Sequence, residues 1–134
     1  MTFSGFDEFI RRCPGEPEES FLRYDDPLAD VIVNTAKAGE GFPWHFDSNN
    51  FTVTLALQNA ESGSAFEYAP MIRSAGEQFD EVANVLDGTS DRVRSLDLQP
   101  GDLQLFRGRY SLCRVAPADR GTAAPRGDFI LRGN

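Results

Sequence analysis

One short segment of the sequence, Trp44-His45-Phe46-Asp47, combines residue types that bind metal ions. Side chains of an extended chain alternate between its two sides, so residues two apart project to the same side. The imidazole of His45 and the carboxylate of Asp47 can therefore converge on one point, and both groups are ligands of divalent transition metals. The spacing alone leaves an alternative, in which His45 is a surface histidine or one packed in the core.

His45 is the only histidine of the chain. The chain has two cysteines, Cys13 and Cys113. The N-terminus lacks the basic and apolar regions of a signal peptide, so we expect a cytoplasmic protein whose cysteines stay reduced. Cys113 is then a free thiol that can pack as a small apolar residue of the interior.

The elements that must position these residues are predicted to be mostly short strands, with one or two short helices. Helical patterns cover 6–12 and 77–86, and a loop rich in Pro and Glu follows the first of them. The runs rich in β-forming residues, separated by turn residues, are 29–36, 51–58, 65–68, 93–98, 103–106 and 112–115. This spacing favours a sandwich or a barrel. We predict an N-terminal helix and acidic loop in 1–20 and a single β-domain in 21–134.

One of these runs alternates clearly between apolar and polar residues. Phe51, Val53, Leu55 and Leu57 share one face of an extended chain, and we expect that face to point into the core. A tight turn is predicted for 99–102, where the sequence reads Gln-Pro-Gly-Asp between two β-rich runs.

Composition and motifs exclude several classes of protein. A chain of 134 residues with a net charge of −8 repels nucleic-acid phosphates, so we expect no nucleic-acid partner. No apolar run approaches the roughly 20 residues that a membrane-spanning helix needs. The sequence contains neither a P-loop nor a dinucleotide-binding glycine loop. A Ser-His-Asp hydrolase is disfavoured, because the one histidine lies in the candidate metal motif.

Four segments of the chain carry a resemblance to a known family: Gly41–Asp47, Asn50–Leu55, Phe66–Tyr68 and Gly101–Val115. In these segments the chain resembles the Fe(II)/2-oxoglutarate-dependent oxygenases, in particular the branch related to the free-amino-acid halogenases and hydroxylases. The resemblance implies a mostly β fold, the double-stranded β-helix, which is a jelly-roll or cupin-like barrel with iron at its mouth. It also implies a shortened or degenerate member of that family.

The resemblance further implies that two histidines and one carboxylate hold Fe(II) and leave positions open for 2-oxoglutarate and O₂. His45 and Asp47 match the first two ligands, and Cys113 stands where the family has its second histidine. By the same resemblance Arg126 pairs with the distal carboxylate of 2-oxoglutarate, because a guanidinium binds a carboxylate bidentately. Arg120 and Arg132 are the alternatives for this role.

The resemblance also suggests a substrate pocket that includes Trp44, Glu67 and Tyr68. A halogenase of this branch has a small residue at the position of Asp47, where chloride binds the metal. The carboxylate of Asp47 therefore indicates a hydroxylase, acting on a small-molecule substrate such as an amino acid.

A thiolate ligand changes the charge of such a site. Fe²⁺ with one carboxylate and two imidazoles carries +1, whereas a Cys113 thiolate in place of one imidazole reduces the charge to zero and weakens the attraction of a dianionic co-substrate. Thiolate is also a soft ligand that favours Zn²⁺. Three hypotheses follow: an oxygenase with a modified triad, a catalytically silent barrel that binds a metal or a small acid, and an inactive fragment.

Overall fold

The structure is a computed structural model that describes residues 5–20, 31–37, 39–59, 62–74, 76–118 and 127–133. Its helices are α1 (Phe6–Arg12), the 3-10 turn η1 (Glu18–Ser20) and α2 (Phe79–Leu86). Its strands are β1 (Ile32–Ala36), β2 (Phe42–His45), β3 (Thr52–Ala56), β4 (Phe66–Ala69), β5 (Arg94–Leu96), β6 (Leu103–Phe106), β7 (Leu112–Val115) and β8 (Gly127–Gly133). Among the helices that the structure describes, none has the length and apolar character of a membrane span.

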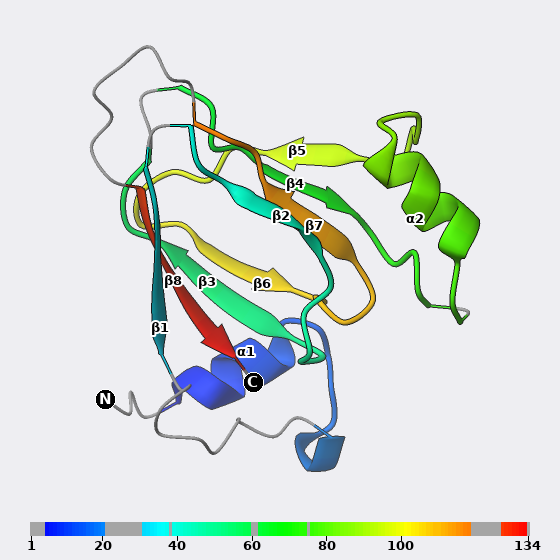
Figure 1. The fold of residues 1–134 in the computed structure, drawn as a ribbon. Helices are drawn as coiled ribbons and strands as arrows, with labels where there is room; N and C mark the ends of the chain where they lie inside the picture. Colours follow the sequence, from blue (N-terminus) through cyan, green and yellow to red (C-terminus); the bar gives the residue numbers. More distant parts are fainter. Residues whose placement is uncertain are drawn as a thin grey trace.

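The strands form two four-stranded antiparallel sheets. Sheet A has the order β1-β8-β3-β6 and sheet B the order β2-β7-β4-β5, so strands distant in sequence lie side by side. Figure 1 shows sheet B above sheet A, with α1 beneath one end of sheet A and α2 beside sheet B. The prediction of a mostly β fold with short helices is confirmed, and neither sheet closes on itself within the described residues.

The predicted elements agree with the structure in type and differ mainly at their ends. α1 coincides with the helix predicted for 6–12, whereas α2 begins at Phe79, two residues after its predicted start. α2 ends where Gly88 follows in a left-handed conformation, with its N–H donating to the carbonyl of Val85. The predicted turn at 99–102 is confirmed by a hydrogen bond of 2.9 Å from the N–H of Asp102 to the carbonyl of Gln99.

The predicted core face of 51–58 is confirmed at Phe51 and Val53, which are 8% and 3% exposed, and it differs from the structure in two respects. Leu57 lies beyond the end of β3 and is 42% exposed. Thr52 and Thr54, on the face predicted to be outside, are buried and line the pocket between the sheets. The reason is that β3 lies between β8 and β6 and is covered on both faces, so alternation does not reveal which face meets the second sheet.

The apolar cluster around α2 lies on the face of sheet B that points away from sheet A. Leu112 precedes Cys113 and Ala69 follows Tyr68 in the sequence, and Cys113 and Tyr68 are on the pocket side of sheet B. Because successive side chains of a strand alternate, Leu112 and Ala69 project to the opposite side. Together with Ile72 and Val85 they form a cluster in which every member is at most 3% exposed. Trp44, Phe46, Val82 and Val93 pack against this cluster. Much of the core of sheet B therefore lies outside the space between the sheets.

Candidate metal centre

The direction of His45 depends on an irregularity in β2. Phe42 pairs with Val115 and His45 pairs with Cys113, so β2 spans three residues where β7 spans two. This extra residue is the mark of a β-bulge, a feature that often re-aims a side chain next to a functional site. Phe42 and His45 both line the pocket, although regular alternation would place them on opposite faces.

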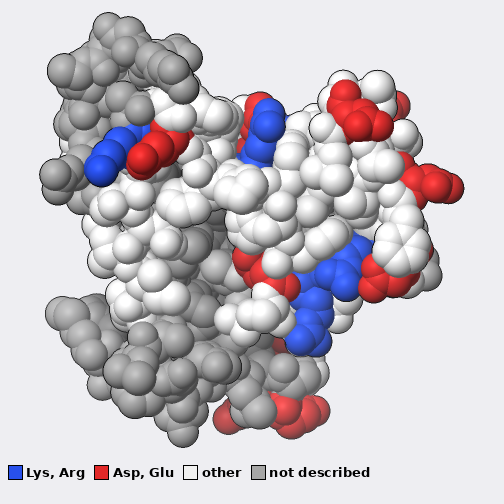
Figure 2. Space-filling view, in the orientation of Figure 1, with Lys and Arg blue, Asp and Glu red and all other residues white. Residues whose placement is uncertain are grey.

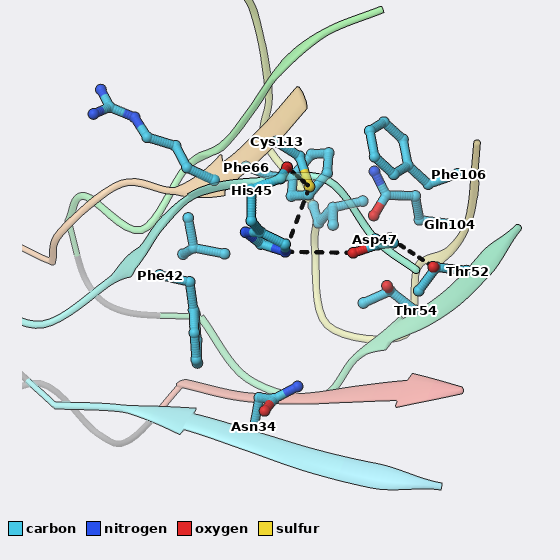
Figure 3. A pocket seen from close by; sticks show the side chains of 13 residues that line it. Asn34, Phe42, His45, Asp47, Thr52, Thr54, Phe66, Gln104, Phe106 and Cys113 are labelled. Atoms are coloured by element: carbon cyan, nitrogen blue, oxygen red, sulfur yellow. Dashed lines mark hydrogen bonds and ion pairs between the residues drawn. The ribbon is translucent and has the colours of Figure 1, made fainter. Parts of the chain in front are cut away.

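The ring of His45 is fixed by the backbone of the bulge. Its Nδ1 lies 2.8 Å from the carbonyl oxygen of Pro43, so Nδ1 carries the proton and donates it. Nε2 points to the other side, 3.4 Å from Oδ1 of Asp47 and 3.8 Å from Sγ of Cys113. In Figure 3 these three side chains meet at one end of the pocket.

Asp47 is held in place by two neighbours, Thr52 and Gly108. The hydroxyl of Thr52 donates a hydrogen bond of 2.6 Å to Oδ2, and the backbone N–H of Asp47 donates to the carbonyl of Gly108 at 3.1 Å. Gly108 is buried, and a Cβ at this position would lie 1.9 Å from Oδ2 of Asp47. Only a glycine leaves room for the carboxylate here.

The segment that follows Asp47 is attached to the turn around Gly108 by further hydrogen bonds. The N–H of Arg109 donates to the carbonyl of Asn49 at 3.1 Å. The Arg109 guanidinium donates to the carbonyl of Ser48, at 2.8 Å from its nearer nitrogen. The turn and the segment after β2 are therefore linked at successive residues, which limits the movement of Asp47.

Cys113 completes a group of three potential ligands. It lies in β7, directly opposite His45 in β2 and Tyr68 in β4, and it is 3% exposed. Its thiol donates a weak hydrogen bond to the backbone carbonyl of His45, with a separation of 3.7 Å. One ligand atom from each of His45, Asp47 and Cys113 lies within 4.8 Å of the others.

The three groups stabilise a proton on the imidazole. Hydrogen bonds to Asp47 and then Cys113 raise the pKa of His45 from 6.5 to about 11, against the opposing effect of burial. Burial alone would raise the pKa of Asp47, but hydrogen bonds from His45 and Thr52 outweigh it and hold the pKa below 3.8. At neutral pH the site without metal therefore contains an imidazolium and a carboxylate, and a bound metal must replace a proton.

The three groups open into a pocket of about 240 Å³ between the two sheets. Sheet A contributes mainly polar side chains and Phe106 to its wall, and sheet B contributes His45, Cys113 and the rings of Phe42 and Phe66. The lining residues are Asn34, Phe42, His45, Asp47, Thr52, Thr54, Phe66, Leu98, Gln104, Phe106, Cys113, Arg114 and Val115.

The predicted substrate residues contact the residues of this wall. Glu67 accepts a hydrogen bond of 2.5 Å from Nε of Arg114, whose guanidinium lies over the Trp44 ring with its centre 4.8 Å from the ring centroid. Tyr68 packs against Phe66 and Phe106, two rings that line the pocket. Trp44, Glu67 and Tyr68 thus contact lining residues and are not themselves part of the lining.

The predicted co-substrate arginine cannot be placed in the same way. Arg126 and its alternative Arg120 lie outside the described residues. Arg132 in β8 is paired with Val53, whereas the pocket-lining Thr54 is paired with Leu131. Val53 is not among the residues that line the pocket. On the face drawn in Figure 2, basic side chains lie next to acidic ones. Arg114, which lines the pocket, forms an ion pair with Glu67.

Sequence reasoning missed several residues of the site. The alternation of 51–58 places Thr52 on the outer face of its strand, and no pattern in the sequence marks Gly108 as a residue of the site. Gln104 and Arg114 were not singled out. One available signal was Pro43: a proline inside an extended segment demotes it to an edge strand or a bulge.

A comparison with protein families finds one match. A family model described as Halogenase D matches residues 9–124, which includes the bulge in β2 and all three potential ligands. A search of curated proteins finds no match.

Proposed function

Because the chain belongs to the halogenase D family, we propose that it is an Fe(II)- and 2-oxoglutarate-dependent oxygenase of the hydroxylase type. Its substrate would be a small molecule such as an amino acid, and O₂ would be the oxidant. The observation that carries the proposal is the convergence of His45, Asp47 and Cys113 at the end of a pocket. In the reaction, 2-oxoglutarate and O₂ give succinate and CO₂, and the second oxygen atom enters a C–H bond of the substrate as a hydroxyl group.

The donor set fits a divalent metal ion. Bonds of about 2.0–2.3 Å to nitrogen, oxygen and sulfur ligands place neighbouring ligand atoms about 3–4 Å apart. The separations of 3.4 Å between His45 and Asp47 and 3.8 Å between His45 and Cys113 fall in this range. Three protein ligands on one side of the ion would leave positions open for other molecules, as in the facial triads of non-haem iron enzymes.

The order of the strands supports a jelly roll as the underlying architecture. β1 pairs with β8, β2 with β7, β3 with β6 and β4 with β5, all antiparallel. This is the pairing of one long antiparallel ribbon that has been rolled up, and such rolling produces two facing sheets. The double-stranded β-helix is a fold of this kind, and it would place the three ligands at one end of the space between the sheets.

The residues of the site have distinct tasks in the proposed function. When bound, the metal supplies the site at which O₂ is reduced and a C–H bond is oxidised. Pro43 keeps the proton of the neutral imidazole on Nδ1, so that Nε2 can bind the metal. Thr52 occupies Oδ2 of Asp47 and leaves Oδ1 for the metal. Asp47 fills the position that a small residue would leave to chloride, which favours hydroxylation over halogenation.

The co-substrate is proposed to bind through Arg126, whose guanidinium can pair with a carboxylate bidentately. A thiolate from Cys113 would make the net charge of Fe²⁺ and its protein ligands zero, so the arginine becomes the main attraction for a dianion. Arg114 is a poor substitute for this role, because its guanidinium already pairs with Glu67.

A second hypothesis, a catalytically silent barrel that binds a metal or a small acid, is favoured by Cys113 itself. A thiolate prefers Zn²⁺ to Fe²⁺, and a sulfur atom next to an oxidising centre is readily oxidised. This hypothesis uses the same pocket and the same three ligands, so it differs from the first in turnover and not in metal binding.

Anaerobic titration of the full chain with Fe(II) and then 2-oxoglutarate tests the proposal. The oxygenase should show the visible charge-transfer band of iron bound to 2-oxoglutarate, followed by O₂-dependent formation of succinate. Metal binding without the band would contradict the oxygenase and support the silent barrel. Arg126→Gln is the matched variant: it should weaken 2-oxoglutarate binding and leave metal affinity nearly unchanged. The same effect from Arg120→Gln would show that the arginine has been wrongly assigned.

A further inference from the structure

The polar wall of the pocket contains one group that the fold leaves unpaired. Gln104 lies in β6 and is 9% exposed, and its Oε1 is buried without a hydrogen-bond partner among the described residues. Buried polar atoms in proteins are nearly always hydrogen-bonded, and an unpaired one lowers stability. A group that is retained at such a cost needs an explanation, and Gln104 faces the pocket.

The register of sheet A places Gln104 close to the candidate metal site. Gln104 is directly opposite Thr54, and Thr52 lies two residues further along the same face of β3. The Thr52 hydroxyl donates to Asp47. Two residues of a strand span roughly 7 Å and neighbouring strands lie about 5 Å apart. A molecule of a few carbon atoms can therefore reach from the metal site to the Gln104 side chain, which Figure 3 shows on the same side of the pocket as Asp47.

The surroundings of Gln104 define the group that it would bind. An amide oxygen accepts hydrogen bonds from N–H or O–H groups. Much of the remaining wall consists of apolar side chains, including the rings of Phe42, Phe66 and Phe106. Of the polar neighbours, Thr52 is already paired with Asp47. The part of a ligand that matches Gln104 is thus an N–H or O–H donor next to an apolar portion.

We infer that Gln104 selects the substrate, by accepting a hydrogen bond through Oε1 from an N–H or O–H group of a small molecule that is apolar next to that donor. The inference deepens the proposed function and depends on it in one respect, because it takes this pocket to be the substrate site. Gln104 then favours molecules that carry a donor at a fixed distance from the metal site. An analogue without the donor leaves the oxygen buried and unpaired, which is the basis of discrimination.

Binding of four small aromatic probes to the full chain tests the inference without iron, 2-oxoglutarate or O₂. Benzyl alcohol offers an O–H donor, benzylamine offers N–H donors, acetophenone offers only an acceptor and toluene offers neither. Ligand-observed NMR titration gives the affinity ratio of each probe to toluene. For a donor probe this ratio should fall about two- to tenfold from the natural protein to Gln104→Leu, the range expected for one hydrogen bond. A comparison of the alcohol with the amine shows which donor the site prefers.

The stability of the variants separates a binding role from a structural one. Gln104→Leu should raise the melting temperature of the ligand-free protein, because leucine leaves no unpaired oxygen. Gln104→Met, which keeps an unbranched side chain, should behave in the same way. Gln99→Leu, at an exposed position of the 99–102 turn, is the control and should change neither stability nor the probe ratios.

Three outcomes would overturn the inference. These are a lower melting temperature for both Gln104 variants, a donor preference that persists in Gln104→Leu, and a preference of the natural protein for acetophenone over benzyl alcohol. Because no turnover is measured, donor selection by Gln104 without oxygenase activity would count against the oxygenase alone. If the charge-transfer band forms but Gln104→Leu leaves the probe ratios unchanged, only this inference is contradicted.

Discussion

The two faces of sheet B differ in what their residues do, although the same strands build both. The face toward sheet A carries His45 and Cys113, which leave ligand atoms directed at a pocket. The face toward α2 carries Leu112 and Ala69, which are buried in an apolar cluster with Val85. Leu112 and Cys113 are adjacent in the sequence, but Leu112 belongs to the apolar cluster and Cys113 to the candidate metal site.

The role of a residue in these strands therefore depends on the face of the sheet from which its side chain projects. In β2 the bulge decides these directions, because it turns His45 toward the pocket and Trp44 toward the cluster. Substitutions on the pocket face should thus change metal binding with little loss of stability. Substitutions on the cluster face should do the reverse.

The largest effect is expected from His45→Ala, which removes the only imidazole of the chain. A carboxylate and a thiol are too few protein ligands to hold a catalytic ion, so binding of divalent metal should fall below detection. Calorimetric titration measures the affinity, and Trp44→Phe, a change on the other face of the same strand, is the control. Unchanged metal affinity in His45→Ala would contradict the candidate metal site.

Cys113→His sharpens the comparison by changing the ligand and keeping its position opposite His45. A neutral imidazole restores both the charge of +1 and the facial triad, so O₂-dependent succinate production should rise by more than roughly tenfold. The larger side chain costs about 1–3 kcal/mol through overpacking, so stability must be measured beside activity. If the folded, iron-loaded variant forms no more succinate than the natural protein, Cys113 does not stand in for a lost ligand.

On the opposite face, Ile72→Ala should reduce stability and leave the metal site intact. Ile72 is fully buried in the cluster, and removing such a side chain costs about 2–5 kcal/mol of unfolding free energy. Phe79→Ala, at a position of α2 that is 72% exposed, should cost less than about 0.5 kcal/mol. Denaturant unfolding and metal titration of both variants check this separation, and a large loss of metal affinity in folded Ile72→Ala would refute it.

Gly108→Ala should weaken metal binding by about 10–100-fold, the usual effect of disturbing a residue that orients a ligand. Its Cβ would overlap the carboxylate of Asp47 and force that carboxylate to move. Gly101→Ala is an informative control, because its Cβ has open space but its φ of +97° is strained for alanine. The control should lose stability and keep metal affinity. Equal metal affinities for the two variants would contradict the assigned role of Gly108.

The smallest effect concerns the stability of the metal-free protein at different pH. A pKa of His45 raised from 6.5 to about 11 stabilises the folded state fully below pH 6.5, and this contribution is lost as the pH rises toward 11. The difference in unfolding free energy between the natural protein and His45→Gln should therefore be larger at pH 5.5 than at pH 9.5. The difference is expected to be modest, because the His45 side chain is 46% exposed. Unfolding in the presence of a chelator measures it, and a pH-independent difference would contradict the ion pair.

The sequence allowed the ligand group to be predicted better than its surroundings. His45 and Asp47 followed from a two-residue spacing, and Cys113 followed from a family resemblance; the structure brings all three together. Most short strands could be predicted because β-branched and aromatic residues mark them. β2 was treated only as an extended segment, because its four residues include a proline and a bulge.

The parts that were missed depend on contacts between distant segments. Nothing local in Thr52 indicates that it holds Asp47, and the need for glycine at 108 comes from a carboxylate 61 positions earlier. The error on β3 has the same origin. Alternation identifies two faces of a strand, but only the packing of the second sheet decides which face borders the pocket.

The proline of the bulge has a consequence for the behaviour of the protein at high concentration. β2 is one edge strand of sheet B among the described strands, and Pro43 offers no N–H to a strand of another molecule. The residue whose carbonyl fixes the His45 ring thus also protects that edge. β1, one edge of sheet A, contains no proline and exposes Ile32 and Val33. Self-association by strand pairing is therefore expected more at β1 than at the edge that carries His45.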